Sequence, residues 1–418
     1  MKKTRIKLTV ISLLLLLAVA VNITGCALPV QAEDLMDGIT PGRVEITDNM
    51  NEKSDVLTDF ALRLFLASNT EGENTLISPL SVLYALAMTA NGADGETRKE
   101  MESTLGMSVT ELNHNLYTYL GSLAVGEKYK ISIANSIWFT ESERFTVNKS
   151  FLQTNADYYG ADIYKAPFNR QTLRDINNWA KKETDGMIPK VLDEIPPEAI
   201  MYLVNALAFD AEWSSIYKKT QVRDGIFTTE DGSREDVELM YSTEGRYLDD
   251  GNATGFIKYY SGSKYAFVAL LPNEGMSVEE YLATLNGESL HNLLKSPESA
   301  TVKTALPKFE SETSLSLVDA LGEMGMSLAF SPTLADFSGI GTSTEGNIFI
   351  DDVIHKTYIS VDERGTRAGA VTVVSMKDGS AAPDEIKTVY LDRPFVYMLI
   401  DCRYDIPFFI GTVMSVNG

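Results

Sequence analysis

Short strand-like runs that alternate with helical stretches, without an intervening linker, most limit how this chain can fold. Runs rich in branched and aromatic residues occur at 131–133, 137–139, 202–204, 265–271 and 395–400. Apolar residues recur at helical spacing over 55–67, 171–182 and 314–324, and Ser78-Pro79 begins a further helix. No proline- or serine-rich linker and no short repeat divides this region. The pattern predicts one mixed domain of the α+β class over residues 54–418.

The first 25 residues have the layout of a secretory signal peptide. Four basic residues precede an apolar run from Leu8 to Val21, which is too short for a membrane-spanning helix. The run ends in Ile-Thr-Gly-Cys at 23–26, which resembles the bacterial lipobox. This resemblance implies cleavage before Cys26 and lipidation of its thiol. The alternative is a plain signal peptide cleaved near Ala27 or Ala32.

Residues 26–53 are polar, contain proline and glycine, and show no periodicity, so we expect a flexible tether after the lipidated cysteine. The protein is then secreted, extracytoplasmic and anchored to the membrane at the cell surface through Cys26. Cys402 would be the one remaining cysteine, so the domain would lack an internal disulfide. Because Cys402 lies in an apolar segment, we interpret it as a small core residue.

Charge and residue patterns argue against several function classes. The formal net charge is −22, and removal of the four basic residues in positions 1–25 would leave −26, which disfavours binding to nucleic acid. None of the three histidines, His114, His291 and His355, has a neighbour at metal-ligand spacing, so we expect no metal site. The sequence also lacks the G-x-S-x-G, P-loop and G-x-G-x-x-G motifs, and we expect no cofactor.

Eight ordered motifs carry a resemblance to a known family. They are Asn-Thr-Leu-Ile-Ser-Pro-Leu-Ser from Asn74, Ala-Asn-Ser-Ile-Trp from Ala134, Ile-Asn-Asn-Trp from Ile176, Leu-Val-Asn from Leu203, Leu-Pro-Lys-Phe from Leu306, Ala-Asp-Phe-Ser-Gly-Ile from Ala335 with Ile-His-Lys from Ile354, and Asp-Arg-Pro-Phe from Asp392. From about Ser54 to Val416 the chain resembles the serpins. The resemblance implies a serpin fold: a large central mixed β-sheet, smaller sheets, a helical layer and an exposed reactive-centre loop, in a monomer.

Residues 363–372 resemble the serpin hinge, the segment that precedes the reactive bond. The hinge residues implied by this resemblance are Glu363, Gly365, Thr366, Ala368, Gly369, Ala370 and Thr372. The sequence departs from the family pattern at Arg367, where glutamate is frequent, and at Gly369, where alanine is frequent.

The same segment has an alternating pattern that does not depend on the resemblance. In a strand one face would carry small residues followed by apolar ones, at Thr366, Ala368, Ala370, Thr372, Val374 and Met376. The opposite face would carry Arg367 and Lys377, which we expect to point toward solvent. The segment is therefore a latent strand that could slide over a packed core.

For a serpin, these features imply an inhibitor of serine proteases and not an enzyme. The protease attacks the loop and forms an acyl-enzyme, and insertion of the hinge as a new strand traps the covalent complex. Family spacing from Glu363 places the reactive bond between Gly379 and Ser380, and the alternatives are cleavage after Val374, Met376 or Lys377. The small residues at 379–382 suit elastase- or subtilisin-like proteases. The alternative function is a non-inhibitory serpin that is cleaved as a substrate or acts as a binding protein.

The resemblance also assigns two clusters beneath the loop. Ser78, Ser81, Asn205 and His355 correspond to the shutter, a hydrogen-bonded cluster under the point where the central sheet parts, and Trp213 corresponds to the breach, where the loop first enters. A catalytic group of Ser78, Asn205 and His355 is the competing interpretation. It lacks an evident acid, and Ser78 opens a helix directly before a proline.

Overall fold

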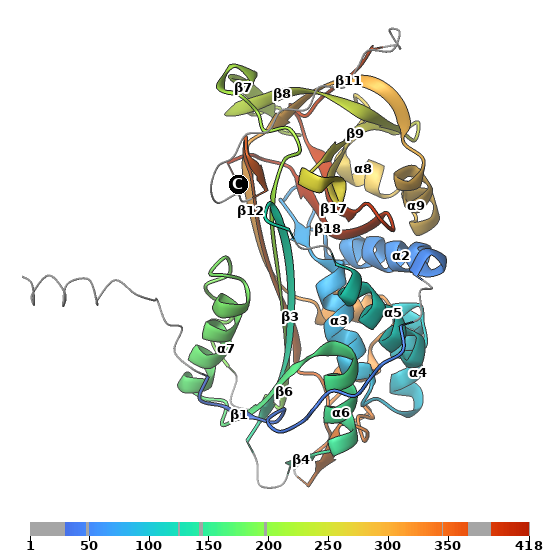
Figure 1. Cartoon of the computed structure of the whole chain (residues 1–418), viewed down its shortest axis with the longest axis vertical. Helices are drawn as coiled ribbons and strands as arrows, with labels where there is room; N and C mark the ends of the chain where they lie inside the picture. The colour runs from blue at the N-terminus through green and yellow to red at the C-terminus, as the bar shows by residue number, and fades with distance from the viewer. Residues whose placement is uncertain are drawn as a thin grey trace, which may run out of the picture.

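The computed structural model describes residues 30–46, 50–123, 126–141, 145–195, 199–344, 346–366 and 386–417. A seven-stranded mixed sheet, here called sheet A, runs along the long axis of the molecule (Figure 1). Its strand order is β1-β5-β3-β6-β15-β14-β12. The bounds are β1 Glu33–Asp34, β3 Tyr129–Thr140, β5 Asp162–Ala166, β6 Met201–Glu212, β12 Phe309–Ser316, β14 Asp352–Val361 and β15 Gly365–Thr366.

A second sheet, here called sheet B, packs at the upper end of the molecule (Figure 1). Its order is β16-β11-β8-β9-β10-β17-β18-β2, and β7 pairs with β8. The bounds are β2 Leu76–Ile77, β7 Val222–Thr228, β8 Arg234–Asp249, β9 Ala253–Tyr259, β10 Tyr265–Pro272, β11 Glu298–Pro307, β16 Ile386–Tyr390, β17 Phe395–Asp401 and β18 Ile406–Val413. A small sheet pairs β4 Phe145–Val147 with β13 Gly341–Ser343.

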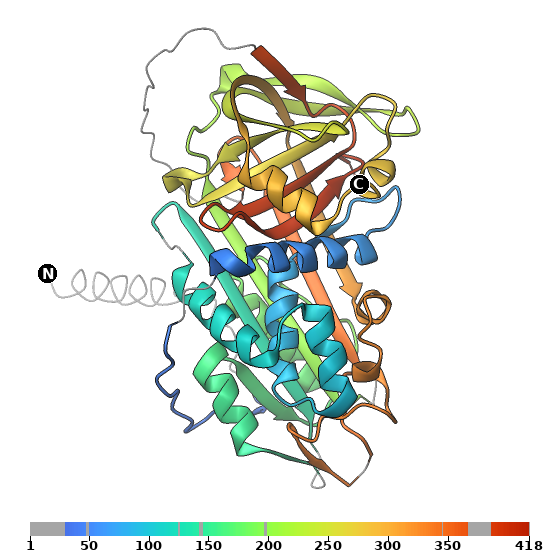
Figure 2. The ribbon, with the colours of Figure 1, turned by 90° about the vertical axis from the view of Figure 1, so that its right-hand side faces the viewer.

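Helices cover sheet A on both faces. One face carries α3 Pro79–Ala90, α5 Val109–Ser122 and α6 Lys149–Tyr159, with α2 Met50–Ser68 and α4 Gly95–Leu105 beside them (Figure 2). The opposite face carries α7 Arg170–Glu183 over its lower part (Figure 1). The remaining helices are α8 Val278–Leu282, α9 Gly287–Lys295 and α10 Val318–Glu323.

Helix α3 shows how local sequence and burial agree. Ser78 caps its N-terminus, since the Ser78 side chain accepts a hydrogen bond from the Ser81 amide, and Pro79 follows in the first turn. Every residue from Pro79 to Ala90 is buried. The helix is buried on all sides because it lies in the main core, which joins both sheets.

The helix predicted over 314–324 is confirmed only over 318–323. β12 extends to Ser316, and α10 begins only at Val318. The alternation in β12 explains the difference, because Phe309, Ser311 and Thr313 are buried while the residues between them are exposed. Period-two burial in the sheet overrides the weaker helical spacing.

The segment predicted as a tether folds against the domain over residues 30–46. Glu33 and Asp34 pair with Lys165 and Tyr164 at the edge of β5. The Gly42 amide donates a hydrogen bond of 2.7 Å to Asp157 Oδ1 on α6. An open strand edge offers backbone partners that a polar segment can satisfy, so this part of the segment is not a free tether. Helix α2 begins at Met50, so the folded domain starts before Ser54.

No helix in the described ranges is long and apolar enough to cross a membrane. The same ranges contain no cluster of three or more His, Cys, Asp or Glu residues able to hold a metal ion.

Candidate functional site

The hinge starts at the upper end of β14, where the chain reverses direction. Asp362 Oδ1 accepts hydrogen bonds from the amides of Arg364 and Gly365 at 2.7 and 3.2 Å, which closes the turn. Gly365 and Thr366 then form β15, which pairs antiparallel with Glu212 and Ala211 of β6. On its other side, Thr366 pairs with Val361 of β14. The first hinge residues thus already lie between β6 and β14.

Gly365 lies where a side chain does not fit. A Cβ atom at this position would be 2.0 Å from the Ala211 carbonyl oxygen and 2.9 Å from Glu212 Cα. Backbone atoms of a central strand cannot move away as a flexible side chain could. The close approach of β15 to β6 explains a glycine at this point of the hinge.

Trp213, predicted at the breach, directly follows β6 and holds the hinge turn. Its indole Nε1 donates to the Asp362 carbonyl at 2.8 Å, and its amide donates to the Arg364 carbonyl at 2.8 Å. Its ring stacks on Tyr260, with centroids 4.5 Å apart and planes inclined by 9°. The Tyr260 hydroxyl in turn contacts Thr366 Oγ1. Thr366 is 2% exposed, so its side chain faces the core.

Glu363 forms an ion pair that links the turn to a neighbouring part of the sheet. Its Oε2 atom is 2.7 Å from Lys308 Nζ, and Lys308 also lies 3.0 Å from Glu238 Oε2. The hydrogen bond from Lys308 lowers the pKa of Glu363, so this carboxylate stays ionised. Lys308 belongs to the Leu306–Phe309 motif, but nothing in the sequence indicated that it pairs with Glu363.

Lys258 is a buried cation beneath Trp213, and nothing in the sequence indicated this position. Lys258 is 2% exposed, and its Nζ atom lies 2.8 Å from Glu244 Oε1 and 4.3 Å from the centroid of the Tyr217 ring. Burial by itself lowers the pKa of Lys258, but Tyr217 and Glu244 raise it above its ordinary value. The amide of Tyr217 donates to the Glu363 carbonyl at 2.9 Å, so the cluster supports the turn from below.

The four residues predicted as the shutter lie together. The Ser78 amide donates to His355 Nε2 at 2.9 Å, which makes Nδ1 the protonated ring nitrogen. Nδ1 then donates to Asn205 Oδ1 at 2.9 Å, and Ser81 Oγ donates to the same oxygen at 3.1 Å. His355 is fully buried, and this burial lowers its pKa to about 3, so the imidazole is neutral.

This geometry opposes the catalytic interpretation of Ser78 and His355. The ring nitrogen that could act as a base toward Ser78 already accepts the Ser78 backbone N–H. The Ser78 hydroxyl oxygen accepts from the Ser81 amide at 3.4 Å as a helix cap. Nucleophilic catalysis needs a contact between the hydroxyl and its base, and the cluster does not form one.

The shutter marks the point above which β6 and β14 separate. The two strands pair in parallel over Asp352–His355 and Tyr202–Asn205. At the upper end of the sheet, β15 lies between them. Asn205 Nδ2 is buried just below this separation and forms no hydrogen bond with any described residue. The candidate site is therefore a sheet whose two central strands are separated at the upper end. Where they begin to pair directly, the buried Asn205 Nδ2 donor lacks a partner among the described residues.

Helix α7 covers the closed part of the sheet. Tyr202 and Val204 of β6 and Ile354 of β14 belong to an apolar cluster with Ile176 and Trp179 of α7. A strand that entered between β6 and β14 would pass under this helix.

The other predicted site residues are placed as follows. Ala368, Gly369, Ala370, Thr372, Val374, Met376, Lys377, Gly379, Ser380 and Cys26 lie outside the described residues. Cys402 is partly buried, and its burial and the neighbouring Asp401 and Asp405 raise the pKa of its thiol to about 12. The thiol is therefore unreactive at neutral pH.

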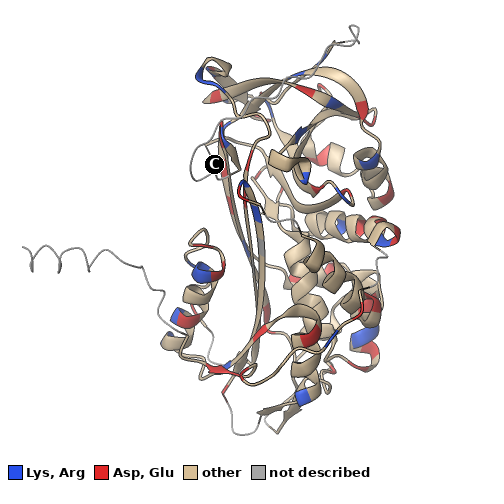
Figure 3. Cartoon of the chain, viewed as in Figure 1, with Lys and Arg blue, Asp and Glu red and all other residues tan. Residues whose placement is uncertain are grey.

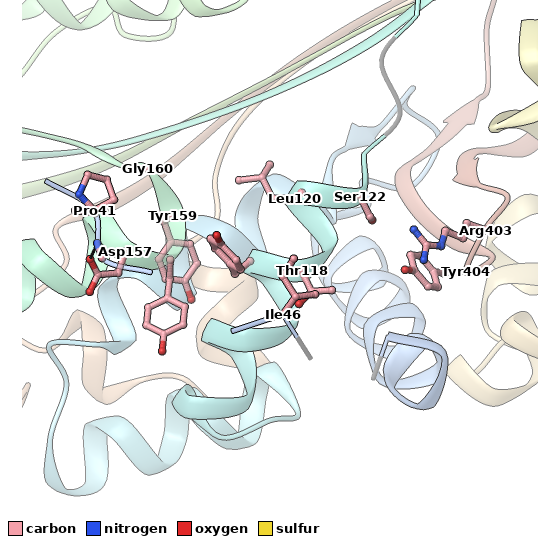
Figure 4. A pocket seen from close by; sticks show the side chains of 15 residues that line it. Pro41, Ile46, Thr118, Leu120, Ser122, Asp157, Tyr159, Gly160, Arg403 and Tyr404 are labelled. Carbon is pink, nitrogen blue, oxygen red and sulfur yellow. Dashed lines mark hydrogen bonds between the residues drawn. The ribbon is translucent and has the colours of Figure 1, made fainter. Parts of the chain in front are cut away.

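A cavity of about 540 Å³ lies away from these residues, between the N-terminal segment, α5, α6 and the turn at Arg403 (Figure 4). Four tyrosines, Tyr117, Tyr158, Tyr159 and Tyr404, contribute to its lining. None of the described hinge, breach or shutter residues lines it. The cavity is therefore separate from the candidate site.

Comparisons with known proteins agree with this architecture. The sequence profile of the family described as Serpin (serine protease inhibitor) matches residues 55–416. The human leukocyte elastase inhibitor is 29% identical over 84% of this chain and 96% of its own length. The crystal structure of the thermophilic serpin tengpin in its native state has a TM-score of 0.88 and 48% identity, covering 92% of this chain and 100% of that one.

The overall conformation can also be compared with a second structure of tengpin. Tengpin in its latent state has a TM-score of 0.79 and 46% identity, covering 90% of this chain and 100% of that one. The described structure is therefore more similar to the native state of that protein. The expected fold is confirmed, and the chain belongs to the serpin family of serine protease inhibitors.

Proposed function

We propose that this protein inhibits serine proteases by inserting its cleaved reactive loop into sheet A. The register of β15 carries the proposal. Thr366 lies opposite Ala211 of β6 and Val361 of β14, and β15 is antiparallel to both strands. Each further loop residue therefore moves one position back along both neighbours. If this register continues, Thr372 lies opposite Asn205 and His355, and Met376 lies opposite Met201, the first residue of β6.

The side chains of the loop match the core that they would enter. Directly paired residues project to the same face of a sheet, and Thr366 faces the core. Ala368 and Ala370 would thus lie beside the large Phe209 and Leu207, and Val374 beside Leu203. All three partners in β6 are buried members of the main core. Small residues meet large ones along this face, which favours entry without a clash.

The shutter would gain a partner from the inserted strand. Thr372 would arrive between Asn205 and His355 on the core side, where the buried Nδ2 of Asn205 has no partner among the described residues. A threonine hydroxyl accepts hydrogen bonds, and satisfying a buried donor is favourable by about 1–3 kcal/mol. Insertion would move β6 and β14 apart and break the 2.9 Å bond between His355 and Asn205, and Thr372 would replace His355 as a partner of Asn205.

The opposite face of the inserted strand would meet two different environments. Arg367 would lie near the upper end of the sheet, toward solvent, as expected from the sequence. Val373, however, would lie beside Val204 and Ile354, which are buried under α7. This face is therefore covered over part of its length, which fits the apolar Val371 and Val373. Insertion would require α7 to move away from the sheet while the strand passes beneath it.

These steps define the trapping reaction. The protease serine attacks the Gly379 carbonyl and expels the amine of Ser380, which leaves an ester between the protease and Gly379. Insertion as far as Met376 would place this residue about 33 Å along sheet A from Thr366, at roughly 3.3 Å per residue, and the ester at Gly379 would follow it toward the lower end of the sheet. Distortion of the protease oxyanion hole would slow hydrolysis, because loss of one donor costs about 10²- to 10³-fold in rate.

The target class is proposed as elastase- or subtilisin-like. The small residues at 379–382 fit a shallow specificity pocket. The name of the human relative, leukocyte elastase inhibitor, supports the same class. Cleavage after Val374, Met376 or Lys377 would shorten the inserted segment.

We further propose that residues 1–25 are a signal peptide and that Cys26 is lipidated. The support is the basic and apolar layout and the lipobox-like residues 23–26. The mature protein would be a monomeric bacterial lipoprotein at the cell surface, and it would meet proteases outside the cytoplasm.

Incubation with pancreatic elastase or subtilisin and a denaturing gel test the inhibitory proposal. We expect a band at the summed mass of the two chains, together with a C-terminal fragment that begins at Ser380 by mass spectrometry. The cleaved protein should unfold at a temperature on the order of 10 °C or more above that of the intact protein. Cleavage without a stable complex and without this increase would instead identify a substrate serpin.

A further inference from the structure

Helix α7 carries a basic outer face on an acidic protein. Arg170, Arg174, Lys181 and Lys182 are exposed, whereas the formal net charge of the whole chain is −22. Figure 3 shows basic residues as blue segments along α7. The charge of this face is thus opposite to that of the protein as a whole.

The spacing along the helix separates the two faces. Arg170, Arg174 and Lys181 recur at intervals of four and seven residues and form one stripe. The buried side consists of Thr172, Asp175, Ile176, Trp179 and Ala180. The stripe therefore points away from the sheet.

Few acids counter this stripe. Of the two acids on α7, Asp175 is buried and Glu183 pairs with Lys182 at 2.7 Å. Asp185, just beyond the helix, pairs with Lys130. Arg174 bonds to the uncharged Gln171 Oε1 at 3.2 Å. Asp162 lies beside the helix, where its carboxylate accepts a hydrogen bond from Trp179 Nε1 at 2.7 Å and attracts Lys182. Acids more than about 10 Å from the stripe are largely screened at 0.1 M salt.

The N-terminal segment reaches the domain beside this helix. The Gln31 amide donates to Asp175 Oδ2 of α7 at 3.1 Å. Val30 and Ala32 pack against the apolar cluster that contains Ile176 and Trp179. Cys26 is only four residues before Val30, and four residues span at most about 14 Å. A lipid on Cys26 would thus hold α7 close to the bilayer.

We infer that the basic face of α7 is a membrane-docking surface, on which the anchored domain rests against anionic lipid headgroups. The inference rests on the proposed attachment at Cys26, which brings this face to the bilayer. Each basic residue near an anionic surface strengthens binding about five-fold. Lipid attachment and a basic patch together form a two-signal anchor, which is more stable than either alone.

The test attaches the chain that starts at Cys26, with Cys402→Ala, to vesicles through a maleimide lipid. This coupling makes the result independent of natural lipidation, which mass spectrometry of the native protein tests separately. The probe is the rate of acetylation of individual lysines on vesicles of 70% phosphatidylcholine and 30% phosphatidylglycerol, compared with pure phosphatidylcholine. We expect Lys181 and Lys182 to react at least about five-fold more slowly on the anionic vesicles.

Exposed lysines on other elements, Lys149, Lys219 and Lys303, serve as internal controls and should react equally on both vesicles. The variant Arg170→Gln with Arg174→Gln keeps both reporter lysines and should abolish their protection. The matched variant Lys149→Gln with Lys219→Gln should not. Equal acetylation of Lys181 and Lys182 on both vesicles, or equal protection of the control lysines, would overturn the inference.

Discussion

Asn205 and His355, which are 150 residues apart in the chain, share a hydrogen bond of 2.9 Å at the last point where β6 and β14 pair. Above this bond the sheet is parted by the hinge, and below it the sheet is closed under α7. Two separate elements thus meet at the position that an inserting strand has to pass. The predictions below test this relationship and the hinge that leads to it.

The free energy of unfolding should decrease as the pH is lowered because His355 is buried in its neutral form. Its folded pKa is about 3, below the ordinary 6.5. Between these values the unfolded chain binds a proton that the folded chain does not, so stability falls as pH decreases from about 6.5 to 3. The contribution is at most about 1.4 kcal/mol per pH unit. Urea unfolding midpoints at pH 7, 5 and 4 measure it. His355→Asn should flatten the dependence, and an unchanged slope in that variant would contradict the assignment.

Gly365→Ala should weaken the hinge because its Cβ would overlap the Ala211 carbonyl oxygen. We expect the intact protein to lose about 1–3 kcal/mol of stability as β15 is displaced. Gly245→Ala is the matched control, since a Cβ at that strand position meets nothing within 4 Å. The thermal unfolding midpoints of both variants measure this loss. Equal midpoints would show that the contacts of β15 contribute little to stability.

Reversing the charge of Glu363 should loosen the hinge turn through Lys308. Glu363→Lys replaces a 2.7 Å ion pair with a repulsion, at a cost of about 1 kcal/mol for partly exposed groups. The double variant Glu363→Lys with Lys308→Glu should recover part of this loss. Chemical denaturation of the unchanged protein, the two single variants and the double variant gives the coupling energy between residues 363 and 308. The exposed pair Lys99 and Glu96 is the comparison, for which we expect a smaller coupling.

The facing of the inserted strand can be tested at two loop positions. Ala370→Arg would bring a charge beside Leu207 in the core, so the variant should be cleaved as a substrate with little covalent complex. Arg367→Glu lies on the other face and should trap nearly as well as the unchanged protein. The ratio of complex to cleaved inhibitor on a gel reports both effects. Similar losses in the two variants would refute the proposed register.

Val373→Asp tests the passage beneath α7. In the proposed register this residue lies beside Val204 and Ile354, where a buried unpaired carboxylate costs several kcal/mol. Trapping should therefore fall by more than ten-fold, although cleavage of the loop continues. Val373→Thr, which is similar in shape but uncharged, should retain most of the trapping. A fully active Val373→Asp would show that insertion stops above α7.

The sequence alone predicted the elements whose signals are local. Ser78-Pro79 as a helix start and the strand-like runs of β3, β6, β10 and β17 depend on neighbouring residues. The motif order indicated the family and, through it, the four shutter residues. Local spacing was right for 318–323, which form α10, but wrong for 314–316, which belong to β12. It also did not predict how residues 30–46 bind to the edge of β5.

Tertiary structure alone decided which distant residues touch. The pairing of Glu363 with Lys308 and the contacts of Trp213 with Tyr260 and Lys258 join segments more than 40 residues apart. Packing also leaves Asn205 Nδ2 buried without a hydrogen-bond partner among the described residues. Helical and strand periods report only which face of its own element a residue occupies. The register across strands is set when the whole core packs, and this register brings Thr372 to the shutter and Val373 under α7 in the proposed mechanism.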